Sequence, residues 1–156
     1  MKIARIKLSD RAAAGVYPDA SGPEIERIVE QAFAEPLEWM RVLLADDRAE
    51  LERTLRRLVD DEQCLLVLTA GGTGPSARDF TPEATRAVLE KELPGFGEIM
   101  RLTSYATVKT AILSRATAGI RGRSLIINLP GRPSAVAECL PLLLPAIAEA
   151  LDHIAG

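Results

Sequence analysis

Two uninterrupted apolar runs of strand length, CLLVLT at 64–69 and SLIINL at 124–129, constrain the fold more than any other feature. Runs without alternating polar residues are typical of parallel strands that helices cover on both faces. Two more strands are predicted at 3–8, whose two basic side chains point away from the apolar side, and at 37–44. Helical segments separate the strands. The sequence therefore predicts a single three-layer α/β/α domain, residues 1–156, with a mostly parallel central sheet.

Capping residues and prolines mark the expected helix ends. A helix is predicted to begin at Ser21, with Glu24 completing a capping box, and Pro36 is predicted to end it. Asp47, together with Glu50, is predicted to cap the helix that follows the second strand. In a sheet of this type ligands sit at the carboxyl ends of the strands, so the loops that follow the strands are the places to look for a site.

Prolines also shape the second half of the chain. A helix is predicted over 81–92, with Thr81 as its N-cap and Pro82 as its first residue. Pro141 and Pro145 are predicted to break the C-terminal helical region, because proline has no N–H to donate within a helix.

The stretch LTAGGTGPSARD, residues 68–79, places Gly71, Gly72 and Gly74 directly after a buried strand. Glycine at this point lets backbone N–H groups turn inward and hold an anion such as a phosphate. A tight turn that needs a positive φ is the structural alternative, and the residues alone leave both open. The loop lacks the Lys-Ser/Thr of a Walker A motif, and the GxGxxA match at 72–77 does not open directly into a helix, so the dinucleotide interpretation is weak.

Two aspartates are expected at the same edge of the sheet, because Asp79 follows the glycine loop and Asp46 follows the second strand. A carboxylate beside a phosphate is repelled unless a cation lies between them, and Mg²⁺ is usually held by one or two carboxylates plus phosphate oxygens. These residues suggest a metal-assisted nucleotide site. In the alternative interpretation, Asp46 and Asp47 only cap a helix and Asp79 pairs with Arg78 on the surface. The residues alone leave both open.

Composition excludes several other classes of function. The net charge of −3 and the aromatic content of 4% argue against a nucleic-acid partner. With His153 as the only histidine, a zinc site or a histidine-activated nucleophile is disfavoured. Cys64 and Cys139 form no CxxC pair and are expected to be free thiols in a reducing compartment. The N-terminus has no signal-peptide core, and CLPLLLPAIA at 139–148 is too short to span a bilayer, so a cytoplasmic protein without a membrane partner is expected.

Five collinear blocks resemble one known family. They are SDRAAAGVYPDASG, LTAGGTGPSARDFTPEAT, PGFGEIMR, AILSRATAGIRG and LIINLPGRP, and together they span nearly the whole chain. They are similar to the molybdopterin adenylyltransferases of molybdenum-cofactor synthesis, MogA and the G domain of gephyrin. The resemblance implies a trimeric α/β protein that uses Mg²⁺ and ATP to transfer AMP onto the terminal phosphate of molybdopterin, with release of pyrophosphate. It also implies a partner of the MoeA type that inserts molybdate.

The resemblance also implies site residues. Asp46 and Asp79 match the aspartates of the family, which implies that they are catalytic residues and magnesium ligands. The blocks further imply contacts with molybdopterin or the nucleotide from residues after each strand end and from two later segments: Ser9, Asp10, Arg11, Gly71, Gly72, Thr73, Gly74, Pro94, Gly95, Gly97, Glu98, Ser114, Arg115, Asn128, Pro130, Gly131 and Arg132.

This sequence departs from the family at one place. Many members carry a lysine shortly after the NLPG block, where this chain has Pro133 to Ala137, so Arg132 is expected to take its role. MoaB-type proteins share the fold and the glycine loop, and Arg11 and Tyr17 favour the MogA type. A molybdopterin carrier without catalysis and a generic nucleotide-binding protein are the remaining alternatives. The two retained aspartates favour an enzyme, because a carrier needs no metal.

Overall fold

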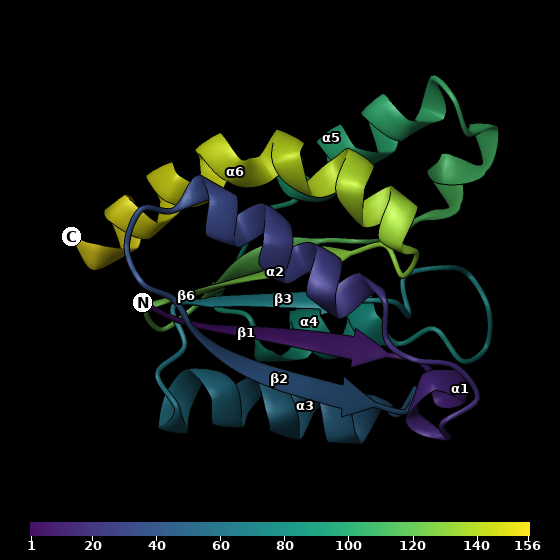
Figure 1. Ribbon diagram of the computed structural model, residues 1–156, viewed down its shortest axis with the longest axis horizontal. Coiled ribbons are helices and arrows are strands. Elements are labelled where there is room, and N and C mark those ends of the chain that lie inside the picture. The colour runs from purple at the N-terminus through teal and green to yellow at the C-terminus, as the bar shows by residue number, and fades with distance from the viewer.

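The computed structural model describes all 156 residues, and its centre is a six-stranded sheet in the order β2-β1-β3-β6-β5-β4 (Figure 1). β2, β1, β3 and β6 are parallel to one another, whereas β5 is antiparallel to β6 and β4 to β5. The predicted α/β fold with a mostly parallel sheet is therefore confirmed. The strands are β1 (Lys2–Leu8), β2 (Glu38–Leu44), β3 (Leu66–Ala70), β4 (Lys91–Glu92), β5 (Ala118–Arg121) and β6 (Ser124–Leu129).

Helices cover both faces of this sheet, with α2, α5 and α6 on one side and α3 and α4 on the other (Figure 1). The short helix α1 follows β1 at the end to which the β1 and β2 arrows point (Figure 1). The helices are α1 (Asp10–Ala13), α2 (Ser21–Ala32), α3 (Arg48–Arg56), which continues into a π-helical turn η1 (Arg57–Asp61), α4 (Thr81–Val88), α5 (Gly95–Tyr105), the 3₁₀ turn η2 (Lys109–Leu113) and α6 (Pro133–Ala155).

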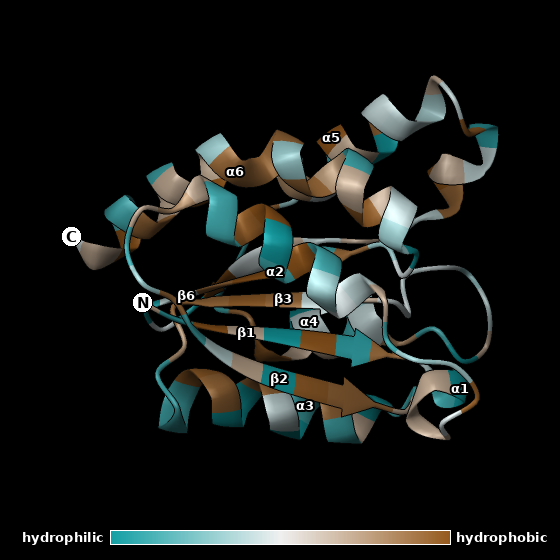
Figure 2. Cartoon of the chain, viewed as in Figure 1, coloured by the Kyte–Doolittle hydropathy of each residue, from teal (hydrophilic) through white to brown (hydrophobic).

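The two apolar runs form the central strands. Every residue of β3 and β6 is buried, because the helices cover both faces of these strands, as the sequence predicted. The core on the α2, α5 and α6 side contains 19 buried residues and that on the α3 and α4 side contains 12. Figure 2 shows the same layering as apolar strands between helices with an apolar inner stripe. A sheet fixed from both sides gives the loops at its edge a rigid base.

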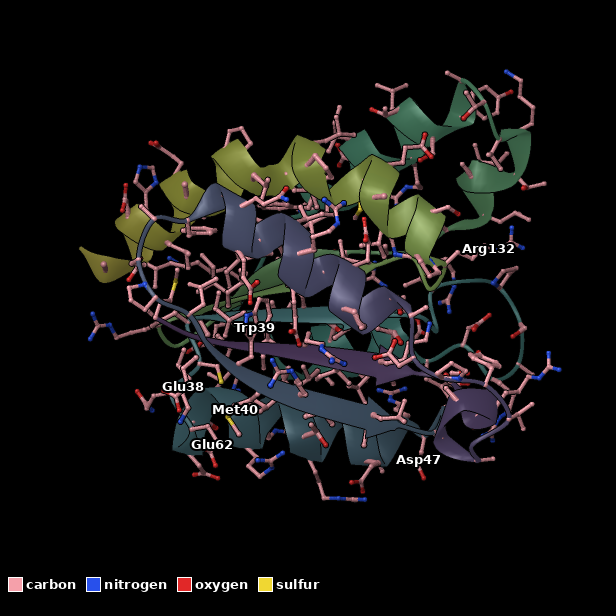
Figure 3. The ribbon with its side chains drawn as sticks, in the orientation of Figure 1. Glu38, Trp39, Met40, Asp47, Glu62 and Arg132 are labelled. Atoms are coloured by element: carbon pink, nitrogen blue, oxygen red, sulfur yellow. The ribbon has the colours of Figure 1, made fainter.

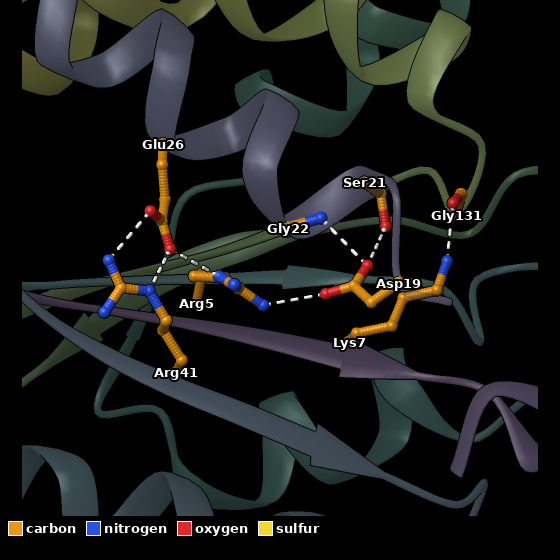
Figure 4. A network of polar contacts seen from close by, with 8 residues as sticks. All are labelled: Arg5, Lys7, Asp19, Ser21, Gly22, Glu26, Arg41 and Gly131. Carbon is orange, nitrogen blue, oxygen red and sulfur yellow. Dashed lines mark hydrogen bonds and ion pairs between the residues drawn. The ribbon is translucent and has the colours of Figure 1, made fainter. Parts of the chain in front are cut away.

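The basic residues of β1 alternate with the apolar ones as predicted, but helix α2 covers them (Figure 4). Arg5 donates to Asp19 Oδ2 at 2.7 Å through Nη1 and to Glu26 Oε1 at 2.9 Å through Nε. Lys7 is 7% exposed, and its Nζ donates to the carbonyl of Gly131 at 2.6 Å. The ion pairs of Arg5 connect β1 to α2, and the hydrogen bond of Lys7 connects β1 to the turn after β6.

Helix capping differs from the prediction in two places. Glu24 forms an ion pair with Arg27 rather than a capping box, and the carboxylate of Asp19 accepts the N–H of Gly22 at the start of α2. This helix ends at Ala32, before the predicted proline stop. Asp47 does cap α3, since its Oδ1 accepts the N–H of Glu50 at 3.0 Å.

The helix predicted over 81–92 ends at Val88 instead. The following residues join the sheet: Leu93 donates its N–H to the carbonyl of Ala118, and Lys91 lies opposite Ile120 in the antiparallel pair of β4 and β5. Thr81 is the first helical residue rather than the N-cap, and its hydroxyl donates to the carbonyl of Gly71. Sheet pairing therefore overrides the local helix preference of this segment.

The C-terminal region forms one helix of 23 residues, α6, although it contains Pro141 and Pro145. Both prolines lie on the exposed side, where water can hydrate the carbonyls that lose their helical partners. By length and composition α6 could cross a membrane, with a mean hydropathy of 1.6 over 18 residues, so the prediction that this region is too short is wrong. Its inner residues Leu140, Leu143 and Ile147 are buried in the core against the sheet, which accounts for much of its apolar character.

Candidate functional site

The carboxyl ends of β1 and β2 are joined by backbone and carboxylate contacts. Ser9 donates its N–H to the carbonyl of Leu44 at 3.0 Å. Asp10 Oδ1 accepts the N–H of Asp46 at 2.9 Å, and Asp46 Oδ2 accepts the N–H of Asp10 at 3.2 Å. The parallel register that pairs Leu8 with Leu44 places these aspartates next to each other, just beyond the two strands. The predicted convergence of strand ends at one edge is therefore observed.

The glycine turn after β3 requires glycine at its first two positions. Gly71 has φ +106° and Gly72 has φ +69°, both in the region that side-chain-bearing residues rarely adopt. A Cβ on Gly71 would collide with the carbonyl of Leu8, and one on Gly72 would collide with the hydroxyl of Thr81. The N–H of Gly71 donates to the carbonyl of Leu129 at 3.2 Å. The turn thus passes closely between the ends of β1 and β6.

The amides of Gly72, Thr73 and Gly74 donate to no acceptor of the protein. Successive N–H groups in such a turn form a concave site for an anion. Unpaired amides are normally satisfied by solvent or ligand, because burying them without a partner is costly. The structure thus shows the positive φ of a tight turn, and the anion-binding interpretation of the glycine loop stays a prediction.

Asp46 and Asp79 both lie close to this loop. A Cβ at position 72, which Gly72 lacks, would lie 3.6 Å from Asp46 Oδ1. A Cβ at position 74 would lie 2.9 Å from Asp79 Oδ2. Asp79 Oδ2 also accepts the N–H and the hydroxyl of Ser76, at 3.0 and 2.7 Å. The two carboxylates thus approach the glycine loop from β2 and from the start of α4, as the metal-assisted interpretation expects.

Partial burial raises the pKa of Asp46 above its ordinary value, and the negative charges of Asp10 and Asp79 add to the effect. The N–H of Asp10 and the charge of Arg78 oppose this rise in pKa without cancelling it. A carboxylate in this environment is stabilised by a cation. No group of three or more His, Cys, Asp or Glu side chains is gathered for a metal. A cation held here would therefore have two carboxylates and the oxygens of a ligand as donors. Hard oxygen donors of this kind suit Mg²⁺.

Of the alternative roles, only helix capping by Asp47 is observed. Asp47, rather than Asp46, caps α3, and its label in Figure 3 lies at the carboxyl end of β2. Arg78 does not pair with Asp79; it forms a bidentate ion pair with Asp10, with N···O distances of 2.9 and 3.0 Å.

Arg115 holds the glycine loop from the side of β5. Its backbone N–H donates to the carbonyl of Thr73 at 2.8 Å, and its guanidinium donates to the carbonyls of Gly74 and Asp79, each at 2.9 Å. The remaining Nη1 forms an ion pair with Glu83. Arg115, predicted to contact a ligand, is therefore used within the protein and positions the loop.

Asn128 is also placed differently from the prediction, because its side chain is 0% exposed. Its amide nitrogen donates to the hydroxyls of Thr69 and Thr85 at 3.1 and 2.9 Å, and its oxygen accepts the N–H of Thr117 at 3.2 Å. Every polar atom of Asn128 is thereby paired inside the protein. It connects β3, β6 and α4 beneath the glycine loop rather than facing a ligand.

A cleft of about 240 Å³ lies near the glycine loop, although no residue of 71–74 lines it. Neighbouring residues link the two: Ser114 in the cleft precedes Arg115, which bonds to the loop, and Pro130 in the cleft precedes Gly131, which lies against Gly71. Figure 3 shows Arg132 at this end of the molecule. The residues that line the cleft come from α5, η2, the segment before β5 and the start of α6: Met100, Arg101, Ser104, Val108, Ala111, Ser114, Ala116, Pro130, Arg132, Ser134, Ala135, Glu138 and Cys139.

This cleft combines an apolar surface with cationic and hydroxyl groups. Of the predicted residues, Ser114, Pro130 and Arg132 line it. Arg101 and Ser104, which lie three positions apart on α5, were not predicted. Their spacing places them on one face of a helix, which is the signal that could have identified them.

The predicted residues of the segment after β4 lie outside the cleft: Pro94, Gly95, Gly97 and Glu98. They follow β4 at the far end of the same sheet edge. Gly97 is buried against the carbonyl of Ala116, where a Cβ would collide, so it allows α5 to pack closely. At the other end of the edge, Ser9 Oγ and the hydroxyl of Tyr17 share a hydrogen bond of 2.6 Å, and the exposed Arg11 lies 6.0 Å from the ring of Tyr17.

Comparisons with known proteins agree with this geometry. The family described as "Probable molybdopterin binding domain" matches residues 4–149. The chain is 52% identical over 151 residues to a molybdopterin adenylyltransferase of Helicobacter pylori strain J99, covering 97% of this chain and 86% of that protein.

Solved structures include both types of relative. A Mog protein from Mycobacterium ulcerans superposes with a TM-score of 0.89 at 40% identity, covering 98% of each chain. A MoaB protein from Thermus thermophilus superposes with a TM-score of 0.88 at 38% identity, covering 98% of this chain and 95% of that one. With an adenylyltransferase half identical to it and the family pattern matched from residue 4 to residue 149, this chain belongs to the molybdopterin-binding family of MogA- and MoaB-like proteins.

Proposed function

We propose that this chain is a nucleotidyltransferase that moves the adenylyl group of ATP onto the terminal phosphate of molybdopterin. An oxygen of the molybdopterin phosphate attacks the α-phosphorus of ATP, the bond from that phosphorus to the β-phosphate bridging oxygen breaks, and pyrophosphate leaves. No covalent bond to the protein is needed. The observation that carries the proposal is the convergence of Asp46, Asp79 and the unpaired amides of 72–74 at the carboxyl edge of the sheet. Relatives that are named molybdopterin adenylyltransferase support it.

The glycine loop would hold the triphosphate. The free N–H groups of Gly72, Thr73 and Gly74 can donate to phosphate oxygens, and such preorganised donors stabilise charge without reorganising during the reaction. Arg115 fixes two carbonyls around the loop, Gly74 and Asp79, so the amides remain oriented when the site is empty of substrate. Positioning and charge neutralisation supply most of the catalysis in phosphoryl-transfer sites of this kind.

Asp46 and Asp79 would hold the divalent cation that accompanies ATP. Mg²⁺ fits, because two carboxylates are available and the pKa of Asp46 is raised by burial and by neighbouring negative charge. When bound, the ion would be held by the two aspartates and would neutralise phosphate charge. The protein supplies the rest of the site by holding Asp46 through the N–H of Asp10.

The cleft would receive molybdopterin. Arg101, Arg132, Ser114 and Ser134 can bind its phosphate, together with the first turn of α6, whose N-terminus has no side-chain cap. The apolar lining then accommodates the pterin rings, because ligand sites combine apolar walls with a few polar groups that fix orientation. In this arrangement Arg132 replaces the lysine that many family members carry nearby.

A second candidate function is a molybdopterin carrier without catalysis, since it would use the same cleft. The raised pKa of Asp46 favours the enzyme, because an unneutralised carboxylate destabilises a carrier and serves it no purpose. Incubation of the protein with molybdopterin and Mg-ATP distinguishes the two. An enzyme yields an adenylyl-pterin product and pyrophosphate in equal amounts, whereas a carrier binds molybdopterin and leaves ATP intact.

We further propose that the chain forms a homotrimer through the exposed apolar residues of α5 and η2. Leu102 is 73% exposed and Ile112 is 65% exposed, and Val108 and Leu113 between and beside them are about half exposed. Contiguous apolar surface of this kind usually marks a protein interface. Analytical ultracentrifugation of Leu102→Glu tests this, with loss of the trimer expected and Leu43→Glu, on the opposite edge strand, as the control.

The remaining steps follow from the family resemblance. The adenylylated product would pass to a MoeA-type protein that inserts molybdate, and both proteins would work in the cytoplasm. A pull-down of a MoeA-type protein by this chain, with and without molybdopterin and Mg-ATP, tests that partnership.

A further inference from the structure

One arginine at this edge has a partner that a substrate could replace. The Arg78 guanidinium donates from Nε to Asp10 Oδ2 at 3.0 Å and from Nη2 to Asp10 Oδ1 at 2.9 Å. The side chains are 62% and 44% exposed, so the pair lies in contact with solvent. It joins the segment after the glycine loop to α1, on the opposite side of the site, and Arg78 has no other partner.

Arg78 lies within the cluster of acidic groups. It precedes Asp79 in sequence, and its partner Asp10 exchanges hydrogen bonds with Asp46. Two other cations beside the loop are already committed, Arg115 to two carbonyls and Glu83 and Lys7 to the carbonyl of Gly131, and Arg132 lines the cleft proposed for molybdopterin. Arg78 is therefore the cation that can move without leaving a buried group unpaired.

The energies favour an exchange of partners. An exposed ion pair contributes about 0.2–1 kcal/mol, because water competes for both groups and the side chains lose freedom. A phosphate group offers the same guanidinium a more highly charged, bidentate acceptor. A triphosphate held on the amides of 72–74 would lie near Asp46 and Asp79. Arg78 precedes Asp79, and its partner Asp10 is bonded to Asp46, so the guanidinium belongs to the same group of side chains.

We propose that Arg78 is a catalytic residue that forms its ion pair with Asp10 only while no ATP is bound. When ATP binds, Arg78 leaves Asp10 and donates to a β- or γ-phosphate oxygen, where it neutralises the charge that accumulates as pyrophosphate leaves. Asp10 is a positioning residue in this scheme, because it keeps the guanidinium beside the site. The inference rests on the proposed adenylyl transfer and deepens it.

A purely structural ion pair makes a different prediction. If the pair only braces the loop, removal of either partner breaks the same contact, and both variants lose ATP affinity and rate to a similar extent. If Arg78 changes partners, the two substitutions have opposite effects on ATP binding. Asp10→Asn keeps an oxygen for the N–H of Asp46 and removes the charge that retains Arg78.

The experiment compares Arg78→Gln, Arg78→Lys, Asp10→Asn and the double variant Asp10→Asn/Arg78→Gln. Arg48→Gln is the matched control, because Arg48 is also an exposed arginine in a single ion pair, with Glu52, on α3. The measurements are kcat and KM for ATP, and the Kd values of Mg-ATP, pyrophosphate and AMP by calorimetry.

Arg78→Gln is expected to lower kcat by about 10²–10³. It should also weaken pyrophosphate binding while AMP binding stays unchanged. Asp10→Asn is expected to tighten Mg-ATP binding by up to about fivefold, the factor that corresponds to breaking one exposed ion pair. The double variant should behave as Arg78→Gln, Arg78→Lys should retain part of the rate, and Arg48→Gln should match the wild type. An Arg78→Gln protein with normal kcat, or an Asp10→Asn protein that loses ATP affinity as Arg78→Gln does, overturns the proposal.

Failure of the proposed function is recognised separately. If the wild type forms no adenylyl-pterin product, adenylyl transfer is wrong whatever the variants do. The Kd values then still decide the role of Arg78, since a change of partners requires opposite shifts of Mg-ATP affinity in Arg78→Gln and Asp10→Asn, and equal shifts overturn it.

Discussion

Asp10 and Asp46 each accept the backbone N–H of the other, at 2.9 and 3.2 Å, across the ends of two parallel strands. This reciprocal contact fixes the Asp46 carboxylate at the edge of the sheet. It leaves Asp46 Oδ1 near Gly72, while Asp79 Oδ2 lies near Gly74 of the same loop. The sheet register therefore determines the distance between the acidic groups that the proposed chemistry uses.

Asp46→Asn is expected to stabilise the metal-free protein and to lower kcat by about 10²–10³. The raised pKa means that the folded protein binds a proton more tightly than the unfolded chain, so ionised Asp46 reduces stability at neutral pH. Stability is regained as the pH falls through the folded pKa, where the wild type and the variant should converge. Thermal unfolding from pH 7 downward in EDTA measures this. A variant that is less stable than the wild type at pH 7 contradicts the assigned environment.

Asp79→Ala is expected to lower the rate of pyrophosphate release by about 10²–10³, because a charge-stabilising group is lost from the site. The fold should survive, since Asp79 is half-buried and its side chain bonds only to Ser76. Ser76→Ala is the control for the local turn and should lose far less activity. Near-normal release by Asp79→Ala in the presence of molybdopterin and Mg-ATP rejects the assignment of Asp79.

Arg132→Ala is expected to raise KM for molybdopterin by about 10–100-fold, the factor that corresponds to one charged hydrogen bond. KM for ATP should not change, because Arg132 lines the cleft rather than the glycine loop. Arg123→Ala, an exposed arginine in the turn between β5 and β6, is the matched control. Equal effects of Arg132→Ala on both substrates would show that the cleft does not bind molybdopterin separately.

Asn128→Leu is expected to destabilise the fold by about 3 kcal/mol or more, because each buried polar group left unpaired costs about 1–3 kcal/mol. The hydroxyls of Thr69 and Thr85 and the N–H of Thr117 would all lose their partner. Urea unfolding measures the loss. Unchanged stability of Asn128→Leu together with weakened ligand binding would show that Asn128 contacts the ligand directly, as the sequence suggested.

The sequence predicted the layers of the fold and the edge of the sheet that carries the site, because both follow from local patterns of apolar residues. The apolar runs 64–69 and 124–129 can only be satisfied by burial on both faces, and parallel strands then place Asp46 and the glycine loop at one edge. The continuous α6 was missed, because the effect of Pro141 and Pro145 depends on which side of the helix faces water.

Side-chain partners were harder to predict than positions. The roles of Arg115 and Asn128 depend on which carbonyls and hydroxyls lie within reach in three dimensions, and local sequence does not specify this. One of the two interpretations left open by the sequence paired Arg78 with the adjacent Asp79, but Arg78 pairs with Asp10, 68 residues away in sequence. The residues after Val88 were predicted to continue the helix, but they extend and pair with strand β5.

The most direct test of the acidic site is calorimetric titration of ATP in Mg²⁺ and in EDTA, with the wild type and the double variant Asp46→Asn/Asp79→Ala. The proposed site predicts that the wild type binds ATP much more tightly with Mg²⁺, because the ion separates the carboxylates from the phosphates. The double variant should bind ATP in EDTA more tightly than the wild type does and should lose the dependence on Mg²⁺. Equal ATP affinity of the wild type with and without Mg²⁺ would contradict the account.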